Sequence, residues 1–237
     1  MLILITNEKI RNDHIQVLQQ SLRFVDKLHL RITEYSGVYT NYIENILSKI
    51  LVDSYNELKN KIVIHLNKHT LSNNNESVIS VHKFQKIIDE LTTNFSIHNF
   101  HFSEEVSKIY LSLIQNHEEF YHHYHSLNVS ASIHHFEIEE DFNHFNYLIY
   151  GPVFESISKK NYFPKVSHFE IQNHLHNIHE NFGIPIIAIG GINSDNFKEA
   201  LKMGFSGVAI KGHIWQSTNP LEQLLNFYES WKKSFVQ

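Results

Sequence analysis

The distribution of apolar and polar residues along the chain predicts alternating strands and helices. Eight short, nearly continuous apolar runs are typical of parallel strands that are buried on both faces. The predicted strands are residues 2–6, 27–31, 62–66, 97–102, 128–132, 147–150, 184–189 and 207–210.

The segments between these runs carry apolar residues at helical spacing, which predicts amphipathic helices. Four helix faces are the clearest, and they consist of Ile43, Ile46, Leu47, Ile50 and Leu51; Phe84, Ile87, Ile88 and Leu91; Val106, Ile109, Tyr110 and Leu113; and Leu221, Leu224, Leu225 and Tyr228. For the helix before the last strand, we expect Asn193 or Ser194 to cap the start and Gly204 to end it.

A strand followed by a helix, eight times over, predicts an α/β fold with a parallel sheet. Eight units favour closure into a single (β/α)8 TIM barrel, although an open, doubly wound sheet would show the same alternation. The 237 residues are close to the roughly 250 of such a barrel. Residues 73–75 are interpreted as a surface loop, and residues 1–237 as one domain.

Composition narrows the functional classes. The chain is 42% hydrophobic and has a formal net charge of -5 without a long basic run, so nucleic acid is not an expected partner. No apolar stretch approaches the length of a membrane span, and we expect a cytoplasmic protein. The absence of cysteine excludes disulfides and thiolate chemistry. Of the 19 histidines, we expect most to be solvated or to lie in loops.

Glycines follow the last two predicted strands, where the working end of such a barrel lies. Gly190 and Gly191 follow the seventh strand, and Lys211 and Gly212 follow the eighth. Glycine lets backbone amides approach a ligand closely, and phosphate sites of these barrels are commonly built from these two loops. We therefore expect a phosphate site here, although tight turns alone would also explain the glycines.

Other polar residues follow the remaining strands. His134 follows the fifth strand, where a histidine can transfer protons near neutral pH. In the loop after the sixth strand, Ser158 could donate hydrogen bonds and Lys159 could neutralise a phosphate. Arg31 closes the second strand, and an ion pair with Glu34 or another carboxylate is at least as well supported there as a binding role.

Few residues in the sequence stand where a metal-binding side chain would be expected. His122, His123 and His125 stand together without a further ligand at a recognised spacing, so a zinc site there is not expected. Glu104 and Glu105 follow the fourth strand and are the candidate Mg²⁺ ligands. They would equally suit the first turn of a helix, where acidic residues favour the helix dipole.

Together these loops resemble one family, the thiamine phosphate synthases and thiazole tautomerases. The resemblance rests on Tyr-Gly-Pro-Val-Phe at 150–154 with Ser158-Lys159, on Ala-Ile-Gly-Gly-Ile at 188–192, and on residues 207–215. It runs in order through nearly the whole chain and is strongest from 130 to 215.

The resemblance implies a reaction and a set of site residues. The family's synthase couples hydroxymethylpyrimidine diphosphate to thiazole phosphate with Mg²⁺ and releases diphosphate. Arg31, Asn67, Ser132 and Lys159 match residues at the diphosphate, and Gly190, Gly191 and Gly212 match the thiazole phosphate site. The resemblance thus implies small pyrimidine and thiazole phosphates as partners, and a homodimer is one option.

The chain also departs from the family pattern. Thr33 stands where a lysine is usual, and Lys68 replaces the aspartate of an Asn-Asp pair, so the Mg²⁺ ligand set is incomplete. Three hypotheses follow: a synthase with an altered diphosphate site, a metal-independent tautomerase that uses His134, and a barrel that only binds a thiamine-related phosphate. The synthase is favoured because Arg31 and the Ser158-Lys159 loop remain.

Overall fold

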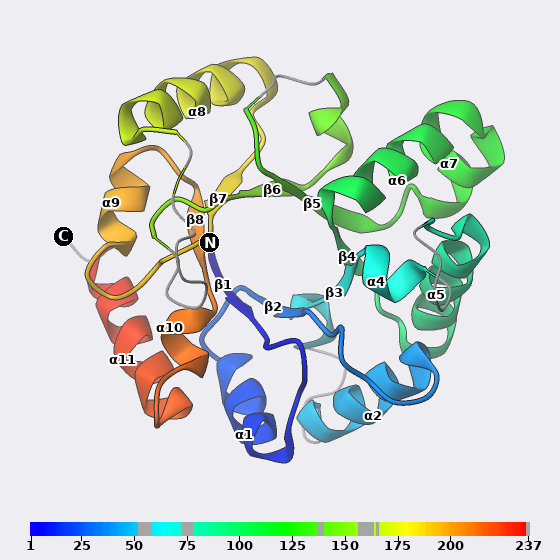
Figure 1. The fold of residues 1–237 in the computed structure, drawn as a ribbon, viewed down its shortest axis with the longest axis horizontal. Helices are drawn as coiled ribbons and strands as arrows, with labels where there is room; N and C mark the ends of the chain where they lie inside the picture. The colour runs from blue at the N-terminus through cyan, green and yellow to red at the C-terminus, as the bar shows by residue number, and fades with distance from the viewer. Residues whose placement is uncertain (52–57, 73–77, 137–139, 156–163, 165, 236–237) are drawn as a thin grey trace.

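The computed structural model describes residues 1–51, 58–72, 78–136, 140–155, 164 and 166–235. Within them, eight parallel strands close into a barrel in chain order, and helices surround it (Figure 1). The strands are β1 (Leu2–Ile5), β2 (Lys27–Leu30), β3 (Ile62–Leu66), β4 (Asn99–Phe102), β5 (Asn128–Ile133), β6 (Tyr147–Tyr150), β7 (Ile186–Ala188) and β8 (Gly207–Ile210). The predicted (β/α)8 barrel is therefore confirmed, with strand ends within two residues of those predicted.

The helices follow the strands along the chain. They are α1 (Asn12–Ser21), α2 (Tyr39–Ile50), α4 (Lys68–Leu71), α5 (Val81–Phe95), α6 (Glu104–Asn116), α7 (Glu118–Tyr124), α8 (His168–Phe182), α9 (Phe197–Lys202), α10 (Gly212–Trp215) and α11 (Pro220–Lys233), with the 3-10 helices η1 (Lys59–Lys61) and η2 (Glu140–His144). None of the described helices is long and apolar enough to cross a membrane.

Two details of the predicted helices are wrong. After β5 the described residues form only η2, because the interval between Ile133 and Tyr147 is short for a helix and its two loops. Helix α9 begins at Phe197 after the cap residue Asn196. Asn193 instead stabilises the preceding turn, where its Oδ1 accepts hydrogen bonds from the amides of Asp195 and Asn196.

Helix faces follow the predicted period, but those of α6 and α11 are rotated. In α6, Leu111 and Ile114 are buried, whereas Ile109 and Leu113 are only partly buried. The predicted face of α5 is wholly buried. In α11 the buried residues are Leu224, Phe227 and Trp231, whereas Leu225 is 38% exposed. Because aromatic side chains remove the most apolar surface from water, the stripe with Phe227 and Trp231 packs inward.

The interior of the barrel is divided into two chemically different halves. An apolar cluster from β1, β6, β7 and β8 fills one side, with Ile3, Ile5, Tyr147, Ile149, Ile187 and Ala209. On the side of β2 to β5 the buried residues are polar, with His29, His65, His101 and Ser130. This polar half lies directly beneath the functional end of the barrel.

Candidate functional site

A pocket of about 540 Å³ lies among the residues that end the strands or follow them. Ten of the predicted site residues line it: Arg31, Asn67, Glu104, Glu105, Ser132, His134, Gly190, Gly191, Lys211 and Gly212. Ser158 and Lys159 lie outside the described residues. The fold therefore gathers residues from six different strand ends around one space.

The glycine turn after β7 is shaped by its contact with the loop after β6. Gly190 and Gly191 have φ angles of 95° and 67°, which are rare for residues with a side chain. A Cβ on Gly190 would lie 2.6 Å from the Cα of Pro152, and one on Gly191 would lie 2.3 Å from the carbonyl oxygen of Glu155. Tight packing of two loops thus requires both glycines, which also line the pocket.

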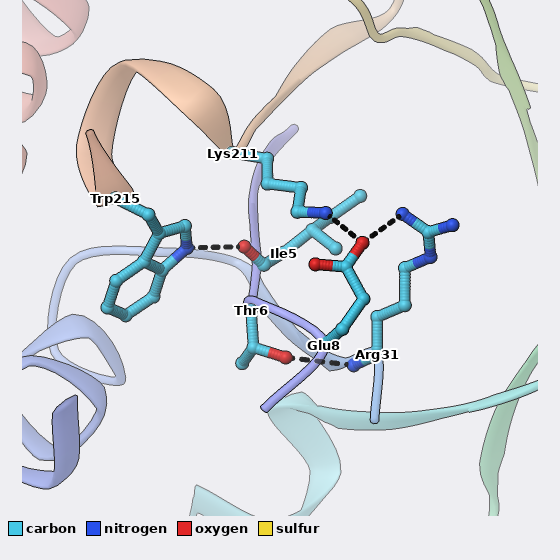
Figure 2. Close-up of polar contacts among 6 residues, drawn as sticks. All are labelled: Ile5, Thr6, Glu8, Arg31, Lys211 and Trp215. Carbon is cyan, nitrogen blue, oxygen red and sulfur yellow. Dashed lines mark hydrogen bonds and ion pairs between the residues drawn. The ribbon is translucent and has the colours of Figure 1, made fainter. Parts of the chain in front are cut away.

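The most strongly interacting charges at the pocket lie on Arg31, Glu8 and Lys211 (Figure 2). Arg31 Nη1 and Lys211 Nζ donate to the same Glu8 oxygen, at 3.2 Å and 2.5 Å. Arg31 does form an ion pair, but its carboxylate partner is Glu8 on the loop after β1 and not Glu34.

The ionisation of Glu8 follows from these contacts. Partial burial alone would raise the pKa of the Glu8 carboxyl, but the hydrogen bond and charge of Lys211 and the charge of Arg31 outweigh it. The pKa of Glu8 therefore lies below its ordinary value, and the carboxylate is ionised at neutral pH. One negative charge is shared between two positive ones at this point.

Backbone contacts fix this group in place (Figure 2). The Arg31 amide donates to Thr6 Oγ1 at 3.0 Å, and the Glu8 carbonyl accepts from the amides of Thr33 and Glu34. Trp215 Nε1 donates to the carbonyl of Ile5 at 2.7 Å. The loops after β1, β2 and β8 are thereby tied together, and the two cations are held on rigid strand ends.

His134 follows β5 immediately and lines the pocket. Its Nδ1 lies 2.8 Å from the carbonyl oxygen of Gly151. Because a carbonyl only accepts, Nδ1 carries a proton, and the tautomer that this contact selects has its lone pair on Nε2. This arrangement makes Nε2 the nitrogen that can accept a proton or a hydrogen bond from a substrate.

The amide and hydroxyl groups on the other side of the pocket already have partners. Asn67 caps α4, and its Oδ1 accepts from the amide and hydroxyl of Thr70. Ser132 Oγ lies 2.8 Å from His101 Nε2. Both residues therefore contribute to the local structure as well as lining the pocket.

Glu104 and Glu105 form the first turn of α6, as the helix-dipole interpretation predicts. Glu104 lies 3.2 Å from Lys108, one turn further along the helix. Adjacent helical positions do not face each other, so the two carboxylates point in different directions.

A cluster of buried histidines lies beneath the pocket, which the sequence reasoning missed. His29, His65 and His101 come from β2, β3 and β4 and are buried, and His65 and His101 line the pocket. Burial and neighbouring positive charge place the pKa of His29 and His65 well below the ordinary value, and lower that of His101 to about 3. The signal in the sequence was a histidine flanked by apolar residues within each strand.

Hydrogen bonds connect these rings to hydroxyl groups. His29 Nδ1 lies 2.7 Å from His65 Nε2, and His29 Nε2 lies 2.7 Å from the hydroxyl of Tyr147. His101 Nδ1 lies 2.9 Å from Ser130 Oγ. By contrast, His122, His123 and His125 are exposed on and next to α7, where His123 contacts Asp89.

The fold and the pocket define a (β/α)8 barrel with glycine turns after β7 and β8 and two cations at its strand ends. Residues 118–214 match the family model described as thiamine monophosphate synthase. A thiamine-phosphate synthase of Picrophilus torridus is 33% identical over 88 residues, which are 37% of this chain and 40% of that protein. The predicted resemblance is confirmed over these residues, where the chain is similar to thiamine phosphate synthases, and it spans less than half the length of the curated protein that it matches.

Solved structures extend the likeness in fold to the whole chain. A thiamine phosphate pyrophosphorylase from Bacteroides thetaiotaomicron has a TM-score of 0.61 and 20% identity, covering 100% of this chain and 98% of that one. One from Pyrococcus furiosus has a TM-score of 0.64 and 15% identity, covering 99% and 96%. At these identities the structures support the fold alone.

Proposed function

We propose that this chain is a transferase of thiamine biosynthesis, which couples hydroxymethylpyrimidine diphosphate to thiazole phosphate and releases diphosphate. The bond from the pyrimidine methylene carbon to the diphosphate oxygen breaks, and the oxygen keeps the electron pair. The thiazole nitrogen then donates its lone pair to that carbon. The observation that carries the proposal is a single pocket lined by the cations Arg31 and Lys211 and by two glycine turns.

The leaving diphosphate would be held by Arg31 and Lys211. Both cations now share Glu8, and the Arg31 and Glu8 side chains are 39% and 38% exposed. An ion pair this exposed contributes only about 0–1 kcal/mol, so an anion of higher charge can compete with Glu8 for Arg31 at little cost. Fixed positive charge where negative charge develops lowers the barrier to bond cleavage.

The thiazole phosphate would lie against the turns after β7 and β8, at Gly190, Gly191 and Gly212. These two loops are the common phosphate site of (β/α)8 barrels. Strand β8 is next to β1 in the closed barrel, and Gly212 directly follows Lys211, so the thiazole phosphate would lie beside the diphosphate along the rim of one pocket. That arrangement suits a reaction between two phosphorylated substrates.

His134 would act through Nε2, which accepts a hydrogen bond or a proton from the bound substrate. The tautomerase hypothesis assigns the same nitrogen the role of acid and base. The protein of Picrophilus torridus described above carries a synthase name, which supports the transferase.

The described residues do not fit a magnesium site of the kind the family uses. The carboxylates among the described pocket residues are Glu104 and Glu105, and they point in different directions. The oxygen of Asn67 is taken by Thr70, and the side chain after it is that of a lysine. Because Mg²⁺ needs near-octahedral oxygen ligands, these residues do not supply the site that it requires.

The direct test is to mix the purified protein with both substrates, with and without Mg²⁺, and to measure thiamine phosphate. We expect product, and we expect the Arg31→Ala variant to form it at least tenfold more slowly. No product in either condition, with both substrates saturating, would rule out the transferase. Isomerisation of a thiazole carboxylate phosphate without metal would then favour the tautomerase.

A further inference from the structure

We propose that His29, His65 and His101 form a binding site for a divalent transition-metal ion, such as Zn²⁺ or Co²⁺, at the floor of the pocket. One ring nitrogen from each residue lies within 4.8 Å of the others. The proposal stands apart from the reaction proposed above, because it needs neither thiamine precursor.

The ligand set has the composition of a zinc site with an open position. Three imidazole ligands and one exchangeable position are typical of catalytic zinc, whereas Mg²⁺ prefers oxygen. His65 and His101 line the pocket, so the open position would face the space where substrates bind. The pocket also provides a path by which an ion reaches the buried rings.

Hydroxyl groups supply outer contacts of the kind that metal-bound histidines require to two of the three rings, those of His29 and His101. The Tyr147 hydroxyl contacts His29 Nε2, and Ser130 and Ser132 contact the two nitrogens of His101. Metal-binding imidazoles almost always donate their second N–H to such a group, which fixes the ring and its tautomer.

The contact between His29 Nδ1 and His65 Nε2 is where the ion would enter. At 2.7 Å these nitrogens share one proton. With Zn–N bonds of about 2.0–2.1 Å, a tetrahedral ion would move them to about 3.3 Å apart. His29 would then carry its proton on Nε2 and donate it to Tyr147, and one His101 nitrogen would exchange its serine for the metal. No net proton is released.

Packing of the barrel interior alone does not explain why three histidines lie in this cluster. The other half of the barrel interior is filled with Ile3, Ile5, Ile149 and Ile187, whose burial leaves no side-chain polar group without a hydrogen bond. Three buried imidazoles must instead be satisfied with hydrogen bonds. Arg31 and Lys211 above the cluster oppose a cation, and Glu8 offsets one of their two charges.

Cobalt titration of the chelator-treated protein tests the site. We expect one equivalent of Co²⁺ to bind with the intense visible absorption of tetrahedral coordination. His65→Gln and His101→Gln should each weaken binding at least tenfold. The matched control replaces the exposed His122, His123 and His125 with glutamine and should leave the spectrum unchanged.

A second measurement guards against variants that fail to fold. Zn²⁺ should raise the unfolding temperature of the unmodified protein, and X-ray absorption of the zinc form should show three imidazole ligands. Loss of the cobalt spectrum in the control variant, an octahedral spectrum, or equal affinity in His101→Gln would overturn the site.

Discussion

Glu8 and Lys211 form an ion pair across the seam at which the first and last strands of the barrel meet. The same Glu8 oxygen also binds Arg31, so one carboxylate neutralises part of the charge of two of the cations that line the pocket. The Glu8 carboxylate therefore occupies the position in which we propose that an anionic group of the substrate binds.

Replacement of Glu8 by glutamine should tighten the binding of inorganic diphosphate. The variant removes the negative charge that competes with the ligand for Arg31 and Lys211. Because the Arg31 pair is exposed, its loss is worth about 0–1 kcal/mol, which corresponds to a gain of up to about fivefold in affinity. Isothermal titration calorimetry at low ionic strength measures this change.

Glu34→Gln is the matched control, because it removes a carboxylate from the neighbouring loop while leaving the Glu8 ion pairs with both cations in place. Its diphosphate affinity should equal that of the unmodified protein. Weaker diphosphate binding in Glu8→Gln would mean that Glu8 organises the cations and does not compete with the ligand.

Alanine at Gly190 or Gly191 should destabilise the protein more than alanine at Gly37. All three glycines have positive φ, and each substitution carries a backbone strain of about 1 kcal/mol or more. Only Gly190 and Gly191 also bring a Cβ against the neighbouring loop, whereas nothing lies within 4 Å at Gly37. Urea unfolding of the three variants measures the difference, and equal losses would contradict the packing described here.

The buried histidines should make the stability of the metal-free protein depend on pH. Their pKa values are lower in the folded state than the value of about 6.5 in the unfolded chain. Their contribution is therefore complete above about pH 6.5 and is lost as the pH falls toward the folded pKa, about 3 for His101. As the pH falls through this range, each histidine should lower the free energy of unfolding by up to about 1.4 kcal/mol per pH unit.

Urea unfolding between pH 7.5 and pH 5 measures that slope. The slope gives the number of protons taken up on unfolding. His101→Asn should lower that number by up to one, and replacement of the exposed His176 should leave it unchanged. An unaltered slope in His101→Asn would show that His101 gains no proton on unfolding.

His134→Ala distinguishes the transferase from the tautomerase. A general acid–base contributes typically 10²–10⁴-fold to a rate, so the tautomerase hypothesis expects a loss of that size. In the transferase the bond cleavage needs no proton from His134, and we expect a loss below about tenfold. Measurement of kcat for thiamine phosphate formation, and for isomerisation of the thiazole carboxylate phosphate, in the variant and the unmodified protein decides between the two roles.

Much of the fold was predictable because hydrophobic period and strand length are local properties. The eight strands follow from runs such as that of β3, and the α5 face from its 3.6-residue repeat. The lack of an α-helix among the described residues after β5 depends on loop length, and the rotation of α6 and α11 depends on competition between side chains for the core. Neither is visible in the period alone.

The site was predictable where chemistry follows a strand directly, as at His134 and Gly190. Glu8 was missed because its role depends on Arg31 and Lys211, which closure of the barrel brings beside it. The histidine cluster was missed because inward-facing positions on β2, β3 and β4 are brought together only by the register of neighbouring strands.

The central claim is that this pocket forms thiamine phosphate from two phosphorylated substrates. The most direct measurement is the amount of thiamine phosphate formed per molecule of protein, with hydroxymethylpyrimidine diphosphate and thiazole phosphate both saturating. The account predicts many turnovers, with equal amounts of diphosphate released. Binding of thiazole phosphate with no thiamine phosphate formed would contradict it and leave a barrel that only binds its ligand.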